Sequence, residues 1–457
     1  MNYIGTRGFA GPRDFAGALL DGLAPDGGLY VPQTYPALAD PSGLARGPYH
    51  DLVETLLGDF GAGVLGIPAM KAAAARTAAA FLRDGETPLT RLSENLWLLE
   101  LYHGPTLAFK DMAMQMMAPL TDAALSLGGQ SLTLVTATSG DTGAAAIHAF
   151  AGSARVKLIV FHPHGRVSAV QRRQMTTIVA DNVLNIAVDG DFDDCQRIVK
   201  VLLGDASLKE RGLISSVNSI NWGRLLGQAP YYLAGAAASG ADRPDFVVPT
   251  GNFGDAFAGW VARRIGGNVG HLHAAVNQND ALSQAINHGL YIRRRAVESA
   301  SVSMDVQAPS NFERLVFEAS GRSVEGTKGL FDSFHATGHA HLSPDLQSAL
   351  QTEVTASTIS EAETAETIRL AWDRFGKVIC PHTAVGLAAA LKRDKGQAQI
   401  VLATAHPAKF PDFVTTALGF APELPGAIHR LDGLQESLRV VANSDDDALA
   451  TVRSFTA

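Results

Sequence analysis

From about residue 96 onward, the sequence alternates between short apolar, β-branched runs and segments with helical periodicity. The clearest runs are SLTLVTAT (131–138), VKLIVFHP (156–163) and DFVVPT (245–250), and each leads through a glycine-containing turn into a helical segment. Apolar strands that alternate with helices are typical of mostly parallel sheets whose two faces are covered. The sequence therefore predicts an α/β protein with a doubly wound sheet, in which ligands bind where strands end and helices begin.

We expect three parts along the chain. Residues 1–95 show apolar positions at helical spacing and form a mostly helical leading segment. Residues 96–210 and 211–457 are expected to form a smaller and a larger α/β domain, with 290–370 as an insertion or a domain connection. The sequence GAGVLG (61–66) fits the dinucleotide pattern G-x-G-x-x-G, but a helical rather than a strand-like segment precedes it, so we interpret it as a loop between helices.

Charge and cysteine content exclude several classes of protein. The net charge is −8 and no basic cluster is present, which argues against nucleic acid or an anionic membrane as partner. Only Cys195 and Cys380 occur, so a disulfide framework is not expected and a reducing compartment is the default. The first residues lack the apolar core of a signal peptide, and no run of about 18 apolar residues could span a membrane. We therefore expect a cytoplasmic protein.

One lysine stands in an unusual setting. In the stretch LYHGPTLAFKDMA (101–113), Lys110 follows an apolar step and precedes an aspartate. A lysine among apolar neighbours loses hydration of its ammonium group, which lowers its pKa and makes the amine available as a nucleophile. The alternative is a lysine whose stem crosses apolar surface while its charge reaches water. The stretch by itself leaves both interpretations open.

The glycine turn TSGDTG (138–143) follows the strand-like run SLTLVTAT. Small residues let the backbone approach a ligand, and the hydroxyls of Ser139 and Thr142 lie at the expected start of a helix. These features suit a carboxylate or a phosphate. An ordinary helix cap made by Ser139 or Asp141 is an equally good interpretation of the turn.

A second glycine turn, PTGNFGDAFAG (249–259), follows the run DFVV. Gly251 and Gly254 permit a tight turn, and the amides of Asn252, Phe253 and Gly254 can converge on a phosphate at a helix N-terminus. The nucleoside-triphosphate motif GxxxxGK[ST] is missing, which favours a cofactor with a single phosphate. Pyridoxal phosphate combines a phosphate with an aldehyde and would account for both this turn and Lys110.

Together these motifs resemble those of the threonine synthases of the bacterial and fungal type. The resemblance extends from near residue 6 to residue 410. The motifs that carry it are TRG (6–8), GLAPDGGLYVP (22–32), HGPTLAFKD (103–111), TATSGDTG (136–143), NSINWGR (218–224), PTGNFGD (249–255) and ATAHPAKF (403–410). It implies the fold of the fold-type II pyridoxal-phosphate enzymes, similar to the tryptophan synthase β subunit, with two doubly wound, mostly parallel sheets.

The resemblance also implies roles for individual residues. Lys110 would carry the cofactor through its amine, and Thr404 would lie near the pyridine nitrogen. The cofactor phosphate would bind the turn formed by Gly251, Asn252, Phe253, Gly254 and Asp255. The substrate carboxylate would bind Thr138, Ser139, Asp141 and Thr142. Our candidates for holding a leaving phosphate are Ser219, Asn221 and Arg224, with Lys377 or Lys409 as further helpers.

The implied reaction converts O-phospho-L-homoserine and water into L-threonine and phosphate. Two alternatives remain open at this point: a serine or threonine dehydratase that uses the same lysine, and a threonine-synthase-like binder of the cofactor or of phosphorylated metabolites without turnover. We expect a monomer or a small homo-oligomer. No metal is expected, because His335, His339 and His341 have no suitably placed cysteine or acid beside them.

Overall fold

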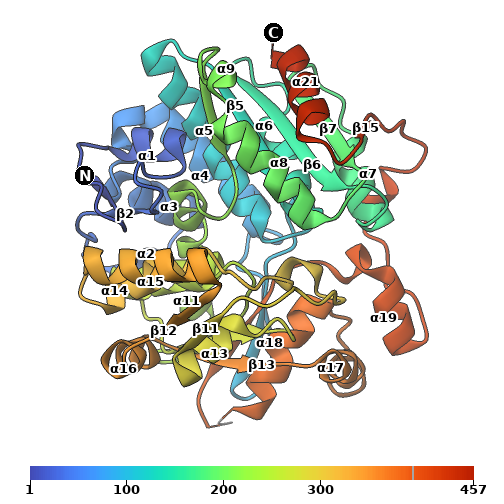
Figure 1. Ribbon diagram of the computed structural model, residues 1–457. Coiled ribbons are helices and arrows are strands. Elements are labelled where there is room, and N and C mark those ends of the chain that lie inside the picture. Colours follow the sequence, from blue (N-terminus) through green and yellow to red (C-terminus); the bar gives the residue numbers. More distant parts are fainter. Residues whose placement is uncertain (394–395, 457) are drawn as a thin grey trace.

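The computed structural model describes residues 1–393 and 396–456. It contains two α/β units, each built on a largely parallel sheet with helices on both faces; the five-stranded sheet lies in the upper half of Figure 1 and the six-stranded sheet in the lower half. This confirms the predicted fold class. No helix among the described residues is long and apolar enough to cross a membrane.

The five-stranded sheet is entirely parallel and has the order β15-β7-β6-β5-β8. Side chains alternate between its faces: Leu134 packs with the helices on one side and Val135 with those on the other. The strands are β5 (Leu132–Ala137), β6 (Val156–Pro163), β7 (Val183–Val188), β8 (Leu213–Ser216) and β15 (Arg439–Val441). The helices around it are α5 (Lys110–Gly128), α6 (Asp141–Phe150), α7 (Ala169–Thr176), α8 (Phe192–Gly204), α9 (Ala206–Lys209) and α21 (Asp445–Thr456).

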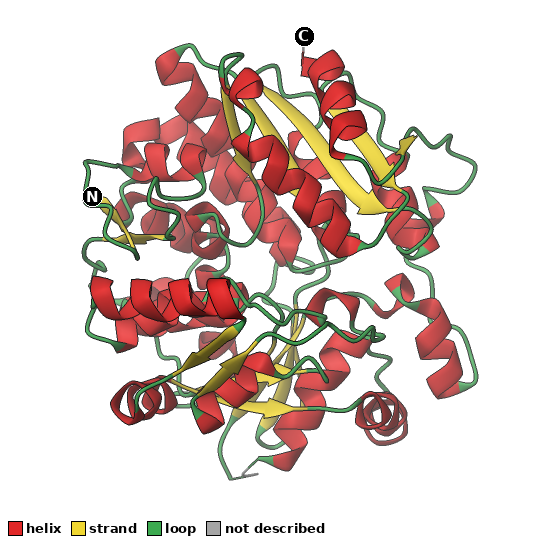
Figure 2. Cartoon of the chain, viewed as in Figure 1, coloured by secondary structure: helices red, strands yellow, loops and turns green. Residues whose placement is uncertain are grey.

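The six-stranded sheet has the order β13-β10-β9-β14-β4-β3, and only the edge strand β3 runs antiparallel to its neighbour. Its strands are β3 (Leu89–Ser93), β4 (Leu96–Glu100), β9 (Asp245–Pro249), β10 (Leu272–Val276), β13 (Val354–Thr358) and β14 (Gln399–Ala403). The associated helices are α10 (Trp222–Leu226), α11 (Ala229–Ser239), α12 (Gly254–Arg264), α13 (Ala281–His288), α16 (Pro344–Glu353), α17 (Glu361–Phe375), α18 (Pro381–Lys392), α19 (Pro411–Leu418) and α20 (Gly426–His429). Figure 2 shows how helices cover both sheets.

The leading segment combines short helices with the two-stranded ribbon of β1 (Tyr3–Gly5) and β2 (Tyr30–Pro32). Its helices are α1 (Phe15–Asp21), α2 (Pro41–Arg46), α3 (Tyr49–Asp59) and α4 (Ile67–Phe81). GAGVLG forms the short 3-10 turn η1 (Ala62–Leu65) between α3 and α4, so the dinucleotide interpretation is excluded there.

Sheet membership does not follow the expected boundaries at residues 95 and 210. Strand β4 lies in the six-stranded sheet, although it begins the expected smaller domain, and β8 and β15 return to the five-stranded sheet. The chain crosses from one sheet to the other after β4, after β8 and after β14, so two boundaries in the sequence do not separate the sheets.

Residues 290–370 are more than a connection. They contribute strand β13 to the six-stranded sheet, together with the ribbon of β11 (Leu290–Ile292) and β12 (His339–His341). They also contain α14 (Phe312–Ala319), α15 (Val324–Thr337) and the 3-10 turn η2 (Val302–Met304). The turn η2 reaches the main cavity, which the sequence did not predict.

Candidate active site

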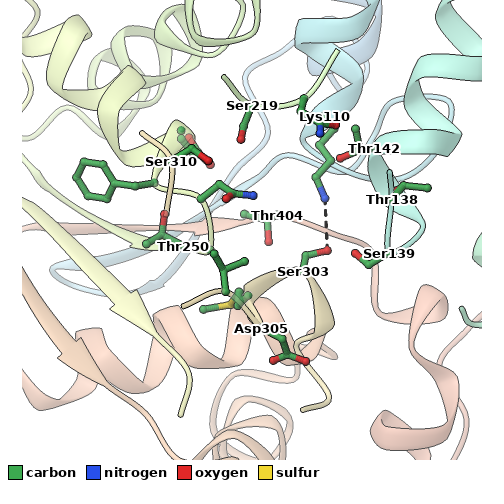
Figure 3. Close-up of a pocket in the computed structure, with 18 of the residues that line it drawn as sticks. Lys110, Thr138, Ser139, Thr142, Ser219, Thr250, Ser303, Asp305, Ser310 and Thr404 are labelled. Atoms are coloured by element: carbon green, nitrogen blue, oxygen red, sulfur yellow. Dashed lines mark hydrogen bonds between the residues drawn. The ribbon is translucent and has the colours of Figure 1, made fainter. Parts of the chain in front are cut away.

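A cavity of about 250 Å³ opens where β5, β9 and β14 end. Figure 3 shows Lys110 extending into it, with Thr138, Ser139 and Thr142 on one side and Thr250 and Ser310 on the other. Sheets of this kind bind ligands at the carboxyl ends of their strands. The cavity therefore brings together the two glycine turns and the lysine that the sequence singled out.

Lys110 is the first residue of α5, and its side chain is buried. Its Nζ lies 3.4 Å from Asp141 Oδ2 and 3.4 Å from Ser303 Oγ. Burial lowers the pKa of Lys110; the carboxylate of Asp141 opposes that effect, and the positive charge of Arg224 adds to it. The structure therefore excludes a lysine whose charge reaches water.

The turn before Lys110 is fixed by Asp111. The Asp111 carboxylate accepts hydrogen bonds from Thr106 N (2.9 Å) and Thr106 Oγ1 (2.6 Å). A Cβ atom on Gly104 would lie 2.6 Å from this carboxylate, so the approach requires glycine. Phe109 N donates to the Thr404 carbonyl oxygen at 2.9 Å, which ties the turn to the end of β14. These contacts give the Lys110 amine a defined direction.

The predicted phosphate turn connects β9 to α12. Phe253 adopts the left-handed conformation (φ 61°) just before α12, and the first amides of a helix have no partner within it, so free amides are available beside the cavity. A Cβ atom on Gly251 would lie 2.4 Å from the Ser303 carbonyl oxygen, which shows how closely turn η2 covers the glycine. All five residues of the turn line the cavity.

One oxygen of the Asp255 carboxylate, Oδ1, is engaged in hydrogen bonds, whereas Oδ2 has no partner among the described residues. Oδ1 accepts hydrogen bonds from Tyr231 Oη and, at 2.8 Å, from Tyr232 Oη. Burial raises the pKa of Asp255 to about 6, and these hydroxyls counter part of that rise. An anion at this turn would therefore bind the backbone of Asp255 rather than its side chain.

The TSGDTG turn combines a cap with an open face. Thr138 Oγ1 accepts hydrogen bonds from Gly140 N (2.9 Å) and Gly143 N (3.0 Å), so it supports the turn itself. Thr138, Ser139 and Thr142 line the cavity. The predicted cap by Ser139 or Asp141 is therefore wrong: the N-cap residue of α6 is Gly140, which has no side-chain cap, and Thr138 supports the turn instead.

Asp141 needs a correction among the predicted substrate-binding residues. Its side chain is absent from the described lining of the cavity and contacts Lys110, Lys409 (Nζ to Oδ1, 2.9 Å) and Gln171 (Nε2 to Oδ1, 2.9 Å). Burial alone would raise the pKa of Asp141, but the two lysines hold it well below its usual range. A carboxylate so placed repels a second carboxylate and instead sets the charge around Lys110.

The segment NSINWGR supplies Ser219 and Arg224 to the cavity lining. Arg224 is buried, and its Nη1 donates to the Val217 carbonyl oxygen at 3.1 Å. Its Nε has no partner among the described residues, and burial lowers the pKa of Arg224 to about 10. Among the residues described in the cavity lining, Lys110 is the single lysine and Arg224 the single arginine. Arg224 therefore offers an anion site beside the cofactor lysine.

The other predicted phosphate contacts are used elsewhere. Asn221 caps α10 through Gly223 N (2.9 Å) and donates to the Leu19 carbonyl oxygen (2.8 Å), because a residue just before a helix satisfies its free amides. Lys377 is half-exposed and lies 3.7 Å from Glu100 Oε1. Lys409 is fully buried against Asp141. None of the three is in the described cavity lining. The prediction that they bind the phosphate directly is therefore wrong.

Comparisons with known proteins give the family. The model for "Pyridoxal-phosphate dependent enzyme" matches residues 80–329, and models for the N terminus and the C-terminal part of threonine synthase match 2–75 and 383–455. A threonine synthase from Pseudomonas aeruginosa is 41% identical to this chain, and the match covers 100% of this chain and 98% of that protein.

Solved structures agree with this match. The pyridoxal-phosphate-bound threonine synthase from Brucella melitensis has a TM-score of 0.95 and 41% identity, with coverage of 100% of this chain and 99% of that chain. The threonine synthase from yeast has a TM-score of 0.92 and 32% identity, with coverage of 99% and 98%. This chain belongs to the threonine synthase family. It is therefore a pyridoxal-phosphate-dependent lyase, and the cofactor and enzyme class expected from the sequence are confirmed.

The cavity fits that cofactor. It offers a buried amine with a lowered pKa, a glycine turn at a helix N-terminus and the hydroxyl of Thr404 in one enclosed space. These are the donors that an aldehyde, a phosphate and a ring nitrogen require. Among the described residues, no three His, Cys, Asp or Glu side chains are grouped as a metal site would need.

The turn η2 was not predicted from the sequence. Ser303 and Asp305 line the cavity, and Ser303 N donates to His382 Nε2 at 3.2 Å. Asp305 accepts hydrogen bonds from Asn277 (2.7 Å) and Ser299 Oγ (2.6 Å), which anchor the turn. No strand or helix period marks this segment, and only its run of small polar residues could have suggested a buried hydrogen-bonded loop.

Proposed function

We propose that this enzyme converts O-phospho-L-homoserine and water into L-threonine and phosphate. The observation that carries the proposal is Arg224, a buried cation with a free Nε that lines the cavity containing Lys110. A substrate with a phosphate leaving group needs such a site besides the turn that holds the cofactor phosphate. We also propose a cytoplasmic protein that acts as a monomer or a small homo-oligomer; its two cysteines are free and buried, which suits a reducing compartment.

The residues have distinct proposed roles. The amides of the turn 251–255 hold the cofactor phosphate, Lys110 binds the cofactor aldehyde, and Thr404 hydrogen-bonds its ring nitrogen. Ser139 and Thr142, with the start of α6, bind the substrate carboxylate, and Thr138 supports their turn. Arg224 and Ser219 bind the phosphate that leaves.

When bound, pyridoxal phosphate withdraws electrons and thereby acidifies the hydrogens at the substrate Cα and Cβ. The substrate amine takes the place of the Lys110 amine. The Lys110 amine is then free to take a proton at Cα and then at Cβ. Breakage of the Cγ–O bond releases phosphate to Arg224, and Cγ gains a proton in place of the one lost at Cβ. Water then supplies its hydroxyl to Cβ and its remaining proton to the phosphate, and Cα regains a proton. The overall balance is one water consumed and one phosphate released.

A serine or threonine dehydratase is the second candidate, since it would use the same lysine and phosphate turn. It would need no cation for a leaving phosphate. The desolvation free energy of burying the Arg224 charge would then have no functional reason. A cofactor binder without turnover would use the Lys110 amine but would not need the buried cation Arg224 beside it. Both alternatives are less well supported.

Replacing Arg224 with glutamine is expected to lower kcat/KM for phosphate release from O-phospho-L-homoserine roughly a hundredfold, because a charge-matched donor to the departing oxygen is lost. The absorbance of the bound cofactor is expected to persist. Released phosphate and cofactor absorbance are measured on the same samples.

The matched control is Arg155→Gln, because Arg155 is exposed in the loop before β6. Wild-type kinetics in Arg224→Gln would remove Arg224 from the site. Keto acid formed from serine or threonine, with no phosphate released from O-phospho-L-homoserine, would instead favour the dehydratase.

A further inference from the structure

Three buried charged side chains meet behind the cofactor site. Asp141, from α6, lies between Lys110 of α5 and Lys409 of the 3-10 turn η3 (Pro407–Lys409). The side chain of Lys409 has 0% exposure, that of Asp141 4% and that of Lys110 10%. One carboxylate therefore contacts two lysines, of which Lys409 is fully buried and Lys110 lines the cavity.

The contacts of the two lysines with Asp141 are unequal. Lys409 Nζ is 2.9 Å from Asp141 Oδ1 and also donates to the Thr106 carbonyl oxygen at 2.6 Å. Lys110 Nζ is 3.4 Å from Asp141 Oδ2. Lys409 thus has the closer contact with Asp141 and a second acceptor, and a buried polar group is stabilised by such hydrogen bonds.

The charge balance points in the same direction. If both lysines were protonated, a buried set of two cations would share one anion; if Lys110 is neutral, Asp141 and Lys409 form a balanced pair. Gln171 Nε2 fixes the same Asp141 oxygen at 2.9 Å, so the carboxylate cannot turn wholly toward Lys110.

Other groups around Lys110 do not replace this pair. Asp141 faces it from α6, Lys409 from η3, Arg224 from α10, and His382 from α18, where the thiol of Cys380 also lies buried. Burial lowers the pKa of His382 to about 4, so this side chain is uncharged near neutrality. Arg224 adds a positive charge, and Asp141 is the anion that opposes it.

We propose that Lys409 is a positioning residue that holds the Asp141 carboxylate in an ion pair and thereby leaves the Lys110 amine unprotonated for cofactor binding and proton transfer. Lys409 touches neither the cavity nor, on this proposal, the substrate. Its effect reaches the chemistry through Asp141. This role of Lys409 rests on the proposed function only where phosphate release is measured. The rate of cofactor uptake tests the role of Lys409 without reference to the substrate.

Loss of the charge on Lys409 and loss of the charge on Asp141 are expected to shift the pKa of Lys110 in opposite directions. Without the Lys409 charge, Asp141 acts on Lys110 alone, the pKa of Lys110 rises, and less free amine is present at neutral pH. Without the Asp141 charge, the pKa of Lys110 falls, because Lys409 and Arg224 remain as unopposed cations. A role in packing alone would not produce shifts in opposite directions.

The test uses the full chain with Lys409→Met, Lys409→Arg and Asp141→Asn. The rate of pyridoxal phosphate uptake after cofactor removal is measured across pH by absorbance. For Lys409→Met, we expect uptake at pH 7 to slow about tenfold and its pH dependence to move to higher pH. For Asp141→Asn, we expect the pH dependence to move to lower pH, and for Lys409→Arg to stay near that of the wild type.

The acid limb of phosphate release by the loaded enzyme should move in the same directions. Lys328→Met is the control, since Lys328 is exposed and pairs only with Asp332 in the contacts described for it. Equal or absent shifts in Lys409→Met and Asp141→Asn, or an Arg variant that behaves like Met, would overturn the proposal. If Lys409→Met does not fold, an unshifted or alkaline-shifted Asp141→Asn overturns it just as well. Shifts in uptake without any phosphate release would count against the proposed function and leave the pair assigned.

Discussion

Lys110→Ala is expected to remove the absorbance of bound pyridoxal phosphate and to lower phosphate release by more than about 10³-fold, because one amine both binds the cofactor and moves protons. In the structure this amine is buried and reaches only Asp141 and Ser303 among its described polar partners within hydrogen-bonding distance. Absorbance spectra and phosphate release from O-phospho-L-homoserine are measured on protein purified in the presence of the cofactor.

Lys328→Met again serves as the matched lysine substitution, since it changes an exposed residue on α15. A Lys110→Ala protein that keeps its yellow colour after dialysis and gel filtration would contradict the assignment of the cofactor lysine. Retained turnover without that colour would contradict the role in proton transfer.

Gly251→Ala is expected to weaken pyridoxal phosphate binding at least tenfold, which is about 1.4 kcal/mol. The added Cβ would lie 2.4 Å from the Ser303 carbonyl oxygen, so either the phosphate turn or the turn η2 must move. The contact is between backbone and side chain Cβ, and neither partner is a flexible end. The dissociation constant is measured by absorbance titration, and the unfolding temperature is recorded beside it.

The control for this substitution is Gly58→Ala. Gly58 lies in α3, and a Cβ there would meet nothing within 4 Å. We expect the Gly58 variant to bind the cofactor as tightly as the wild type. Unaltered binding by Gly251→Ala would show that the turn does not hold the phosphate.

The parts of the fold that depend on local pattern could be predicted from the sequence. The run VKLIVFHP coincides with β6, and the segment WGRLLGQAPYYLAGAAAS forms α10 and α11, with Pro230 in the first turn of α11, where proline is tolerated. Lys110 and the two glycine turns could be found because each lies beside a strand end or within a distinctive short motif. Their meeting in one cavity follows from the parallel sheets.

Contacts between distant segments could not be predicted. Lys409 and Asp141 are far apart in the sequence, and nothing local to Lys409 shows that its charge is buried rather than solvated. Asn221 and Ser303 illustrate the same limit in opposite ways. The first looked like a ligand and is a helix cap, whereas the second lies in a segment without a period and reaches the Lys110 amine.

The position of β14 has a consequence for how the protein is made. This strand lies between β9 and β4, yet it consists of Gln399–Ala403 in a chain of 457 residues. While the ribosome is still working, β4 and β9 have both emerged, but each presents an open edge where β14 will later insert. Open edges recruit strands of other chains, and incomplete chains aggregate by this route. If translation stops before residue 399, the fragment is inactive and also has two unpaired strand edges, on β4 and β9. We expect such a fragment to aggregate unless it is degraded.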